Sequence, residues 1–210
     1  MSRQVFDFDE VIDRHGTNCS KWDTMDEKYK RKDLIHLGVA DMDFRSPKPI
    51  IDSFQKCLDH GIFGYTDLSN SFYDGFIAWM KKRHSVHVDR EEIVFCPRIN
   101  ISSSLCVETL TRKGDEVIIH TPAYGPLYQS IVKNDRKVVN SPLRSSGERY
   151  TIDFQKMEEQ VSPDTKMLIL CSPHNPVGRV WNREELEKVG EFCVKHDLIL
   201  FVDEIHGDIA

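Results

Sequence analysis

The stretch from Thr165 to His206 constrains the fold more than any other part of the sequence. It contains two short apolar runs, Met167–Cys171 and Leu198–Val202, on either side of a charged segment. Continuous apolar runs of this length are typical of strands that are buried on both faces of a parallel sheet. Parallel neighbours need a crossover connection, which is right-handed in nearly all proteins. The stretch therefore predicts a strand, a turn, a helix and a second strand of an α/β fold.

Local signals place the helix of this unit after Asn182. The side chain of Asn182 is suited to cap a helix, and Glu185 stands three residues later, which is the spacing of a capping box. Apolar residues then recur with helical spacing, so one side of the helix is expected to pack on the sheet. Three of these residues share one face and a fourth lies at its margin: Leu186, Val189, Cys193 and, at the margin, Phe192.

A polar residue follows each of the two predicted strands, Asn175 after the first and Asp203 at the end of the second. Ligands of open α/β sheets bind at this carboxyl edge. A buried carboxylate is costly unless it meets a cation or a donor, and a protonated pyridine nitrogen of pyridoxal phosphate (PLP) would satisfy Asp203. The amide of Asn175 would then donate to the phenolic oxygen of the same ring. The alternative is an aspartate paired with a lysine and an asparagine that only shapes a turn.

The combination of motifs is more specific than either residue. The segment Ser172–Gly178, followed by Asp203–His206, resembles the fold-type I PLP enzymes of the aspartate aminotransferase superfamily. Four further blocks resemble the MalY/PatB group of cystathionine β-lyases: Asp13–Gly16, Asp41–Phe44, Phe63–Tyr65 and His120–Tyr124. The resemblance covers the whole chain. It implies an α/β, PLP-dependent transferase-like fold with a mostly parallel sheet flanked by helices, truncated before the later strands and the C-terminal domain.

Composition and charge exclude other classes of protein. The chain has 210 residues, 40% of them hydrophobic and 30% charged, with a net charge of -6, which gives no support to a nucleic-acid or membrane-surface partner. The first ten residues lack the apolar core of a signal peptide, and no run is long enough to span a membrane. We therefore expect a cytoplasmic globular protein. The six cysteines show no CxxC spacing, so we expect reduced thiols and no metal site.

The resemblance divides the chain at residue 45. Residues 1–45, with a short strand expected at 34–40, correspond to an N-terminal arm and part of a small domain, and residues 46–210 to the first part of the large PLP-binding domain. Helices are expected from residue 46 and over 71–84, the second with Phe72, Phe76, Trp79 and Met80 inside. The resemblance makes Tyr65 a residue that reaches across a homodimer toward the partner's cofactor phosphate. By composition alone it is only a loop tyrosine.

Two further segments supply candidate cofactor contacts. A strand expected over 92–96 leads into a serine-rich helix start, which is suited to hold a phosphate. The register that the resemblance implies assigns this role to the backbone N–H groups of Ile99 and Asn100, with Ile101 as a further candidate. The ring of Tyr124, just past another strand, is expected to lie flat on the cofactor ring, or else to fill the seam between sheet and helix. His206 matches the family motif, and a structural role is expected for it. No GxGxxG is present, which argues against a dinucleotide site.

The main departure from the family pattern concerns the lysine that binds PLP as a Schiff base and moves the Cα proton. The family places it in a Ser-x-x-Lys or Ser-Gly-Ser-Lys segment on a later strand, and no lysine of this chain lies in such a segment. We therefore expect this lysine beyond Ala210, no catalytic residue among these 210, and an inactive chain when it is taken alone.

Three functions stay open. The resemblance implies a β-lyase that cleaves cystathionine or a related cysteine S-conjugate to a thiol, pyruvate and ammonia, homodimeric in its full-length form. The first alternative is a PLP-dependent aminotransferase, and the second is a truncated, non-catalytic fragment. Because the closing strands are missing, the sequence predicts an uncovered apolar sheet edge and helix face, and an isolated chain that is poorly soluble, oligomeric or partly folded.

Overall fold

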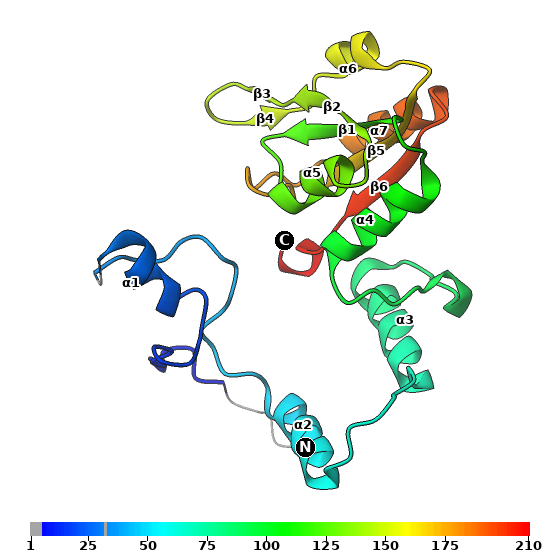
Figure 1. Ribbon diagram of the computed structural model, residues 1–210. Helices are drawn as coiled ribbons and strands as arrows, with labels where there is room; N and C mark the ends of the chain where they lie inside the picture. Colours follow the sequence, from blue (N-terminus) through cyan, green and yellow to red (C-terminus); the bar gives the residue numbers. More distant parts are fainter. Residues whose placement is uncertain (1–5, 32) are drawn as a thin grey trace. The chain divides into compact units, whose positions relative to one another are not determined.

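The chain divides into two units, Met1–Asn70 and Ser71–Ala210, in a computed structural model that describes residues 6–31 and 33–210 (Figure 1). In its described residues, the first unit holds two helices, α1 (Asp23–Tyr29) and α2 (Lys48–His60). The second unit holds α3 (Asn70–His84), which starts at the last residue of the first, and all the strands. Among the described residues, no helix is both long and apolar enough to cross a membrane.

A parallel sheet of four strands organises the second unit (Figure 1). The strand order is β2-β1-β5-β6, and the bounds are β1 (Glu116–Thr121), β2 (Lys137–Pro142), β5 (Thr165–Cys171) and β6 (Ile199–Asp203). The predicted strands β5 and β6 are confirmed as parallel neighbours, with Cys171 opposite Asp203 in the register. The two polar strand ends of the sequence therefore belong to adjacent strands.

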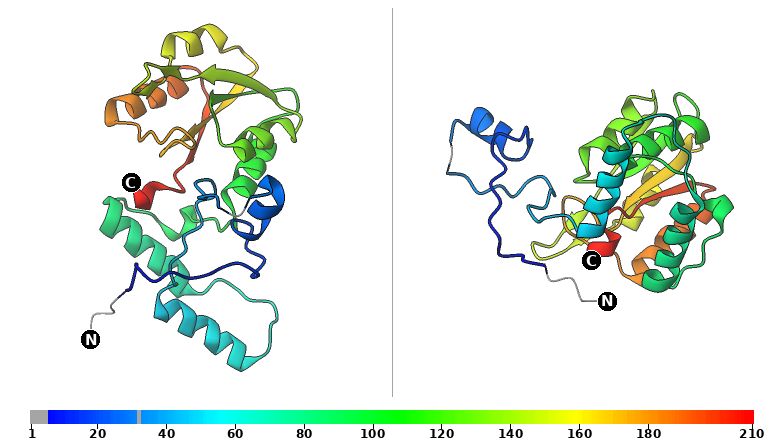
Figure 2. Two further views of the ribbon diagram at one scale, coloured as in Figure 1. Left: turned by 90° about the vertical axis from the view of Figure 1, so that its left-hand side faces the viewer. Right: turned by 90° about the horizontal axis from the view of Figure 1, so that it is seen from below.

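Both faces of the sheet are covered, which explains the continuous apolar runs (Figure 2). On one face lie α4 (Ile99–Leu110) and α5 (Gly125–Val132), and on the other lie α6 (Phe154–Gln160) and α7 (Arg183–Lys195). Side chains alternate between the faces along each strand. The first face buries Val117, Ile119, Met167 and Ile169, and the second buries Ile118, Leu168 and Leu170. Burying each such side chain stabilises the fold by about 1.5–3 kcal/mol.

The predicted capping box begins α7. Asn182 Oδ1 accepts a hydrogen bond from the backbone N–H of Glu185 at 2.9 Å, and Glu185 Oε2 accepts one from the N–H of Asn182 at 2.8 Å. Arg179 binds both oxygens of Glu185. Burial raises the pKa of Glu185, but the N–H of Asn182 and the guanidinium of Arg179 outweigh it and lower this pKa overall. Val189 is buried, as expected for the face that packs on the sheet.

Smaller elements complete the second unit. A two-stranded antiparallel ladder follows β2, and short 3-10 helices lie before α4 and after β6: β3 (Arg144–Ser145), β4 (Tyr150–Thr151), η1 (Arg90–Glu92) and η2 (Gly207–Ile209). Helix α3 is bound to η2, because the carboxylate of Asp208 accepts from Trp79 Nε1 at 3.0 Å and lies 2.7 Å from His84 Nε2. The hydrogen bonds from His84 and Trp79 lower the pKa of Asp208.

Two strand predictions were wrong. Residues 34–40 and 93–96 have no strand assignment, and Glu92 instead ends η1. An apolar run forms a strand only where a neighbour completes its backbone hydrogen bonds, and in the described residues no strand pairs with either segment.

Apolar side chains are exposed on two helices and at one edge of the sheet. Phe72, Phe76 and Trp79 of α3 were expected inside, but they are 40–45% exposed, and α2 has no buried residue. The edge strand β6 also exposes Ile199 and Leu200. The uncovered sheet edge and helix face that the sequence predicts are therefore present in the described residues.

In the first unit, hydrogen bonds and ion pairs join the segment Asp13–Gly16 to the segment Asp41–Phe44. Arg14 contacts Asp41 at 2.9 Å and Asp43 at 2.7 Å, and Asp43 also accepts from Lys21 at 2.6 Å and from Trp22 at 3.0 Å. These contacts join residues that are more than 20 positions apart in a unit with little regular structure. The hydrogen bonds from Lys21, Trp22 and Arg14 hold the pKa of Asp43 well below its usual range.

All six cysteines are free thiols. Cys171 and Cys193 are buried in the second unit, and burial raises the pKa of Cys193 to about 11, whereas Cys57 on α2 is exposed. The described residues contain no cluster of three or more His, Cys, Asp or Glu side chains with metal-binding geometry.

Candidate functional site

Asp203 ends β6 at the carboxyl edge of the sheet, and it is only 2% exposed. Its Oδ1 accepts a hydrogen bond from the backbone N–H of Ile205 at 3.0 Å. No cation of the described residues forms an ion pair with it. A buried carboxylate with spare acceptor capacity is stable only if a further donor or cation reaches it. Asp203 therefore fits the predicted role of binding a protonated ring nitrogen.

Asn175 lies in the loop that follows β5. The loop is joined to β6, because the N–H of Ser172 donates to the carbonyl of Asp203 at 2.9 Å. It then turns back on itself through a hydrogen bond from the N–H of Gly178 to the carbonyl of His174 at 2.8 Å. The amide side chain of Asn175 is half-buried and binds no described residue. It is thus available to a ligand beside the end of β6.

Tyr124 is the N-cap residue of α5, after the turn that follows β1, and it is 37% exposed. His174 Nε2 lies 2.8 Å from the carbonyl oxygen of Pro122, two residues before it. The turn that carries Tyr124 is therefore bound to the loop that carries Asn175. The side chain of Tyr124 is thus partly accessible to a ligand at this edge.

Ile99 and Asn100 are the first two residues of α4. The first intrahelical bonds run from the N–H groups of Ile101 and Ser102 to the carbonyl of Arg98, so the N–H groups of Ile99 and Asn100 point out of the helix without a described partner. Such a helix start is suited to an anion. No serine caps this helix, because Arg98 is the N-cap and Ser102 Oγ donates to the carbonyl of Ile99 at 2.9 Å.

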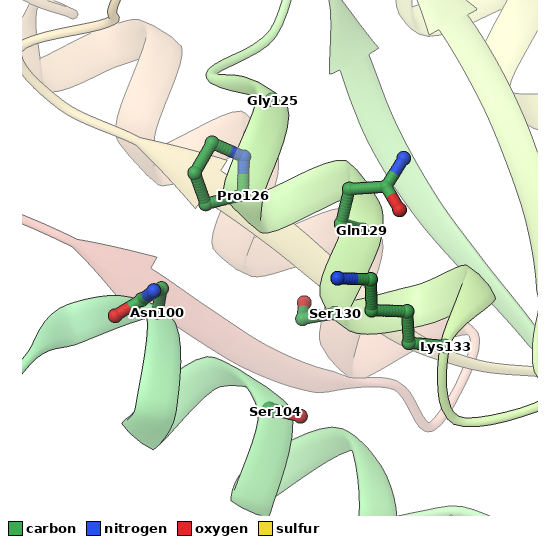
Figure 3. A pocket seen from close by; sticks show the side chains of 7 residues that line it. All are labelled: Asn100, Ser104, Gly125, Pro126, Gln129, Ser130 and Lys133. Atoms are coloured by element: carbon green, nitrogen blue, oxygen red, sulfur yellow. The ribbon is translucent and has the colours of Figure 1, made fainter.

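A groove of about 330 Å³ lies between α4 and α5 and includes one of the predicted phosphate contacts (Figure 3). Figure 3 shows Ser130 and the amine of Lys133 pointing into the space that faces α4. The lining residues are Asn100, Ser104, Gly125, Pro126, Gln129, Ser130 and Lys133. Gly125 follows Tyr124 directly, whereas Asp203 and Asn175 do not line the groove. The groove therefore includes the residue next to Tyr124 but neither Asp203 nor Asn175.

The remaining two predicted positions stand apart. Tyr65 belongs to the first unit and is fully exposed. His206 is half-buried and precedes η2, where its carbonyl accepts from the N–H of Ile209 at 3.0 Å. The structural role that the sequence suggested for it stays a prediction.

Sequence reasoning missed two residues that hold this site together. His174 joins the two turns, and Trp181 donates from Nε1 to the carbonyl of Cys171 at 2.8 Å, which fixes the end of β5. The ring of His174 meets the ring of Trp181 edge-on at 5.7 Å. Two sequence features pointed to these residues. A histidine stands between the end of the apolar run and Asn175, and a tryptophan stands directly before the helix cap Asn182.

Comparison with known proteins gives the family. Residues 32–210 match the family "Aminotransferase class I and II". The chain is 41% identical to cystathionine β-lyase PatB of Bacillus subtilis, over 96% of this chain and 52% of PatB, and 35% identical to the protein MalY of Escherichia coli, over 98% of this chain and 53% of MalY. The crystal structure of cystalysin from Treponema denticola, which contains PLP, superposes with a TM-score of 0.91 at 36% identity and covers 98% of this chain and 53% of cystalysin.

The chain spans about half the length of the curated relatives that it matches. Within that span, the parallel sheet flanked by helices is the fold of these PLP-dependent proteins. The motifs Ser172–Gly178 and Asp203–His206 both fall inside the matched region. The chain belongs to the class I and II aminotransferase family.

Proposed function

We propose that this chain provides cofactor contacts of a PLP-dependent enzyme that cleaves the carbon–sulfur bond of cystathionine or a related cysteine S-conjugate. The carrying observation is that Asp203 and Asn175 end neighbouring parallel strands, while His174 binds the turn that carries Tyr124 to the same edge. The family is PLP-dependent, and two of the similar proteins named above are a cystathionine β-lyase and a PLP-containing cystalysin. These similarities support a lyase.

Each residue receives one role in this proposal. The carboxylate of Asp203 holds a proton on the ring nitrogen, the amide of Asn175 donates to the phenolic oxygen, and the ring of Tyr124 covers one face of the cofactor. The outward N–H groups of Ile99 and Asn100 bind the phosphate at the positive end of α4. Bound PLP supplies an electron sink for the Cα carbanion, so that the thiolate can leave from Cβ. Hydrolysis of the remaining three-carbon enamine by one water then gives pyruvate and ammonia.

We propose roles for two further residues. Tyr65 reaches the cofactor phosphate of the partner in a homodimer, and His206 supports the segment that follows Asp203. Residues 1–45 form an arm and part of a small domain, and residues 46–210 the first part of the PLP-binding domain. We assign no catalytic residue to this chain, and we propose that residues 1–210 alone do not turn over. We also propose a cytoplasmic location.

The test uses the full-length protein with PLP and cystathionine. A lyase releases pyruvate and ammonia without a keto-acid acceptor, and Asp203→Asn lowers kcat/KM at least 10- to 100-fold, because a hydrogen bond to a charged group is worth about 1.5–3 kcal/mol. The matched control Asp197→Asn changes an exposed carboxylate in the turn before β6 and leaves kcat/KM unchanged. Wild-type activity in Asp203→Asn would contradict the role of this carboxylate.

The second candidate is an aminotransferase, which the family name favours. It predicts that substrate is consumed only when a keto acid is present, and that the amino group appears on that acid. Pyruvate release from cystathionine in the absence of any keto acid would exclude it. Consumption that depends strictly on the acceptor would instead exclude the lyase.

A further inference from the structure

Three buried polar side chains lie together behind the candidate site, on the α7 face of the sheet. They are His120 of β1, Ser141 of β2 and His174 of the loop after β5, with exposed fractions of 0%, 1% and 3%. His120 shares its face with Ile118, because side chains alternate along the strand, and Ser141 is its partner in the parallel register. His174 joins them from the edge, since its ring contacts Trp181 in the same core.

Each of the three carries one buried polar atom with no hydrogen-bond partner: His120 Nε2, Ser141 Oγ and His174 Nδ1. Only one other side chain of the described residues, Gln160, has such an atom. An unsatisfied buried polar atom is rare in native proteins, because each one forfeits its hydration. Three of them on one face, at adjacent strand ends, indicate a shared partner that is not a side chain.

The partners of the other ring atoms determine which nitrogen of each histidine carries its proton. His120 Nδ1 lies 3.3 Å from the carbonyl oxygen of Ser141, and His174 Nε2 lies 2.8 Å from the carbonyl oxygen of Pro122. A carbonyl oxygen only accepts, so both of these nitrogens are donors. If the rings are neutral, His120 Nε2 and His174 Nδ1 are lone-pair acceptors, and each needs a donor.

Burial favours the neutral rings. The pKa of His120 is lowered to about 4, mainly by burial. The hydrogen bond to the Ser141 carbonyl opposes this shift, and repulsion from a charge on His174 adds to it. Burial also lowers the pKa of His174, although the carbonyls of Pro122 and Cys171 oppose the shift. The carbonyl of Cys171 accepts from Trp181 Nε1 and has a second lone pair, but no hydrogen bond joins it to His174 Nδ1. At neutral pH the cluster therefore offers two acceptors and the hydroxyl of Ser141.

We propose that one internal water molecule occupies the centre of this cluster, and that it makes His174 a positioning residue for the two cofactor-binding turns. Water has two donors and two acceptor sites. It donates to His120 Nε2 and to His174 Nδ1 and accepts from Ser141 Oγ, which satisfies all three atoms. Internal waters typically make about three hydrogen bonds of this kind.

The water completes a link that the direct contacts only begin. His174 Nε2 holds the turn before Tyr124, and through the water its other nitrogen is fixed to β1 and β2. The ring thus has no freedom to rotate, and the loop that carries Asn175 is held at a fixed distance from Tyr124. The positioning role rests on the proposed function, whereas the water site does not depend on it.

The first experiment determines the protonation of both rings in the full-length protein without PLP. Long-range ¹H–¹⁵N spectra at neutral pH are expected to show His120 with its proton on Nδ1 and His174 with its proton on Nε2. A high-resolution crystal structure is expected to show one water within hydrogen-bond distance of the three atoms. A cationic His174, a proton on its Nδ1, or direct contact of Ser141 Oγ with a ring nitrogen and no water density would overturn the proposal.

The second experiment tests positioning. His174→Phe keeps a ring beside Trp181 but removes both hydrogen bonds, and it is expected to raise the dissociation constant of PLP about five- to tenfold, as the loss of about 1 kcal/mol or slightly more implies. Ser141→Ala, which removes only the donor to the water, is expected to raise it less while both rings keep their tautomers. His196→Phe, at the end of α7, serves as the matched control and leaves the constant unchanged.

The two experiments fail separately. If the wild-type protein does not bind PLP, the proposed function is wrong, but the tautomers and the water density still decide the water site. If PLP binds and His174→Phe binds it as tightly as His196→Phe does, the positioning role is wrong while the proposed function stands.

Discussion

The buried imidazole of His120 makes the stability of the second unit depend on pH. Its pKa is lowered by burial from 6.5 to about 4 in the folded protein, whereas the unfolded chain keeps the ordinary value. As the pH falls below 6.5, His120 therefore binds a proton in the unfolded chain but stays neutral in the folded protein. The contribution of His120 to stability is complete above pH 6.5, and it is lost progressively as the pH falls toward 4.

The size of this loss follows from linkage. Each unit of difference between the two pKa values is worth about 1.4 kcal/mol, so His120 alone accounts for a fall of about 3 kcal/mol across the window. The pKa of His174 is lowered in the same direction, so its titration adds to the fall. Paired carboxylates also lose stability in acid, which is why the measurement has to be a difference between variants.

The assay is urea unfolding of the full-length protein at about pH 7.5 and about pH 4.5, for the wild type and for His120→Asn. The variant keeps a polar side chain but does not titrate, so its stability is expected to fall by about 2–3 kcal/mol less between the two pH values. His87→Asn, which changes an exposed ring, is expected to follow the wild type. Equal falls in the wild type and His120→Asn, or an NMR titration midpoint of the His120 ring near its ordinary value, would refute the reasoning.

Three other substitutions test the packing around the site, each by urea unfolding of the full-length protein. Trp181→Phe removes a buried donor and part of a buried ring, so a loss of about 2 kcal/mol is expected, against less than about 0.5 kcal/mol for Tyr128→Phe, which removes only an exposed hydroxyl on α5. Arg136→Lys is expected to lower the free energy of unfolding by about 2–3 kcal/mol. The buried guanidinium binds two carbonyls and a hydroxyl at the end of α4 and one further carbonyl, and an ammonium cannot reach all four. An unchanged urea midpoint would contradict this. Asn182→Ala removes the cap of α7 and should lose about 1 kcal/mol, whereas Asn182→Asp should lose far less; equal losses argue against the cap.

The predictions that rested on two agreeing signals within a short stretch of sequence were confirmed. The pair β5 and β6 and the capping box at Asn182 and Glu185 each rest on a pattern that only one structure satisfies. The expected strand at 92–96 failed because apolar alternation does not specify a neighbour. The serines after Asn100 do not cap α4, since a hydroxyl binds the carbonyl of the preceding turn as readily as it caps a helix.

The candidate site was only partly predictable for a similar reason. Asp203 and Asn175 were found because strand ends of a parallel sheet share an edge, and this follows from topology alone. His174 was not found, because its role depends on which carbonyl its ring reaches across 52 positions of sequence. Tyr65 and His206 came from resemblance, and their roles stay predictions.

The bond between α3 and η2 has a consequence for synthesis on the ribosome. Trp79 and His84 are 129 and 124 positions from Asp208, so α3 emerges long before the carboxylate that binds it. Contacts of such large separation form late, because the chain between them must first be ordered. Throughout that interval Trp79 and His84 lack this partner, and in a nascent chain that stalls before codon 208 the indole N–H of Trp79 stays bound to water or to a chaperone.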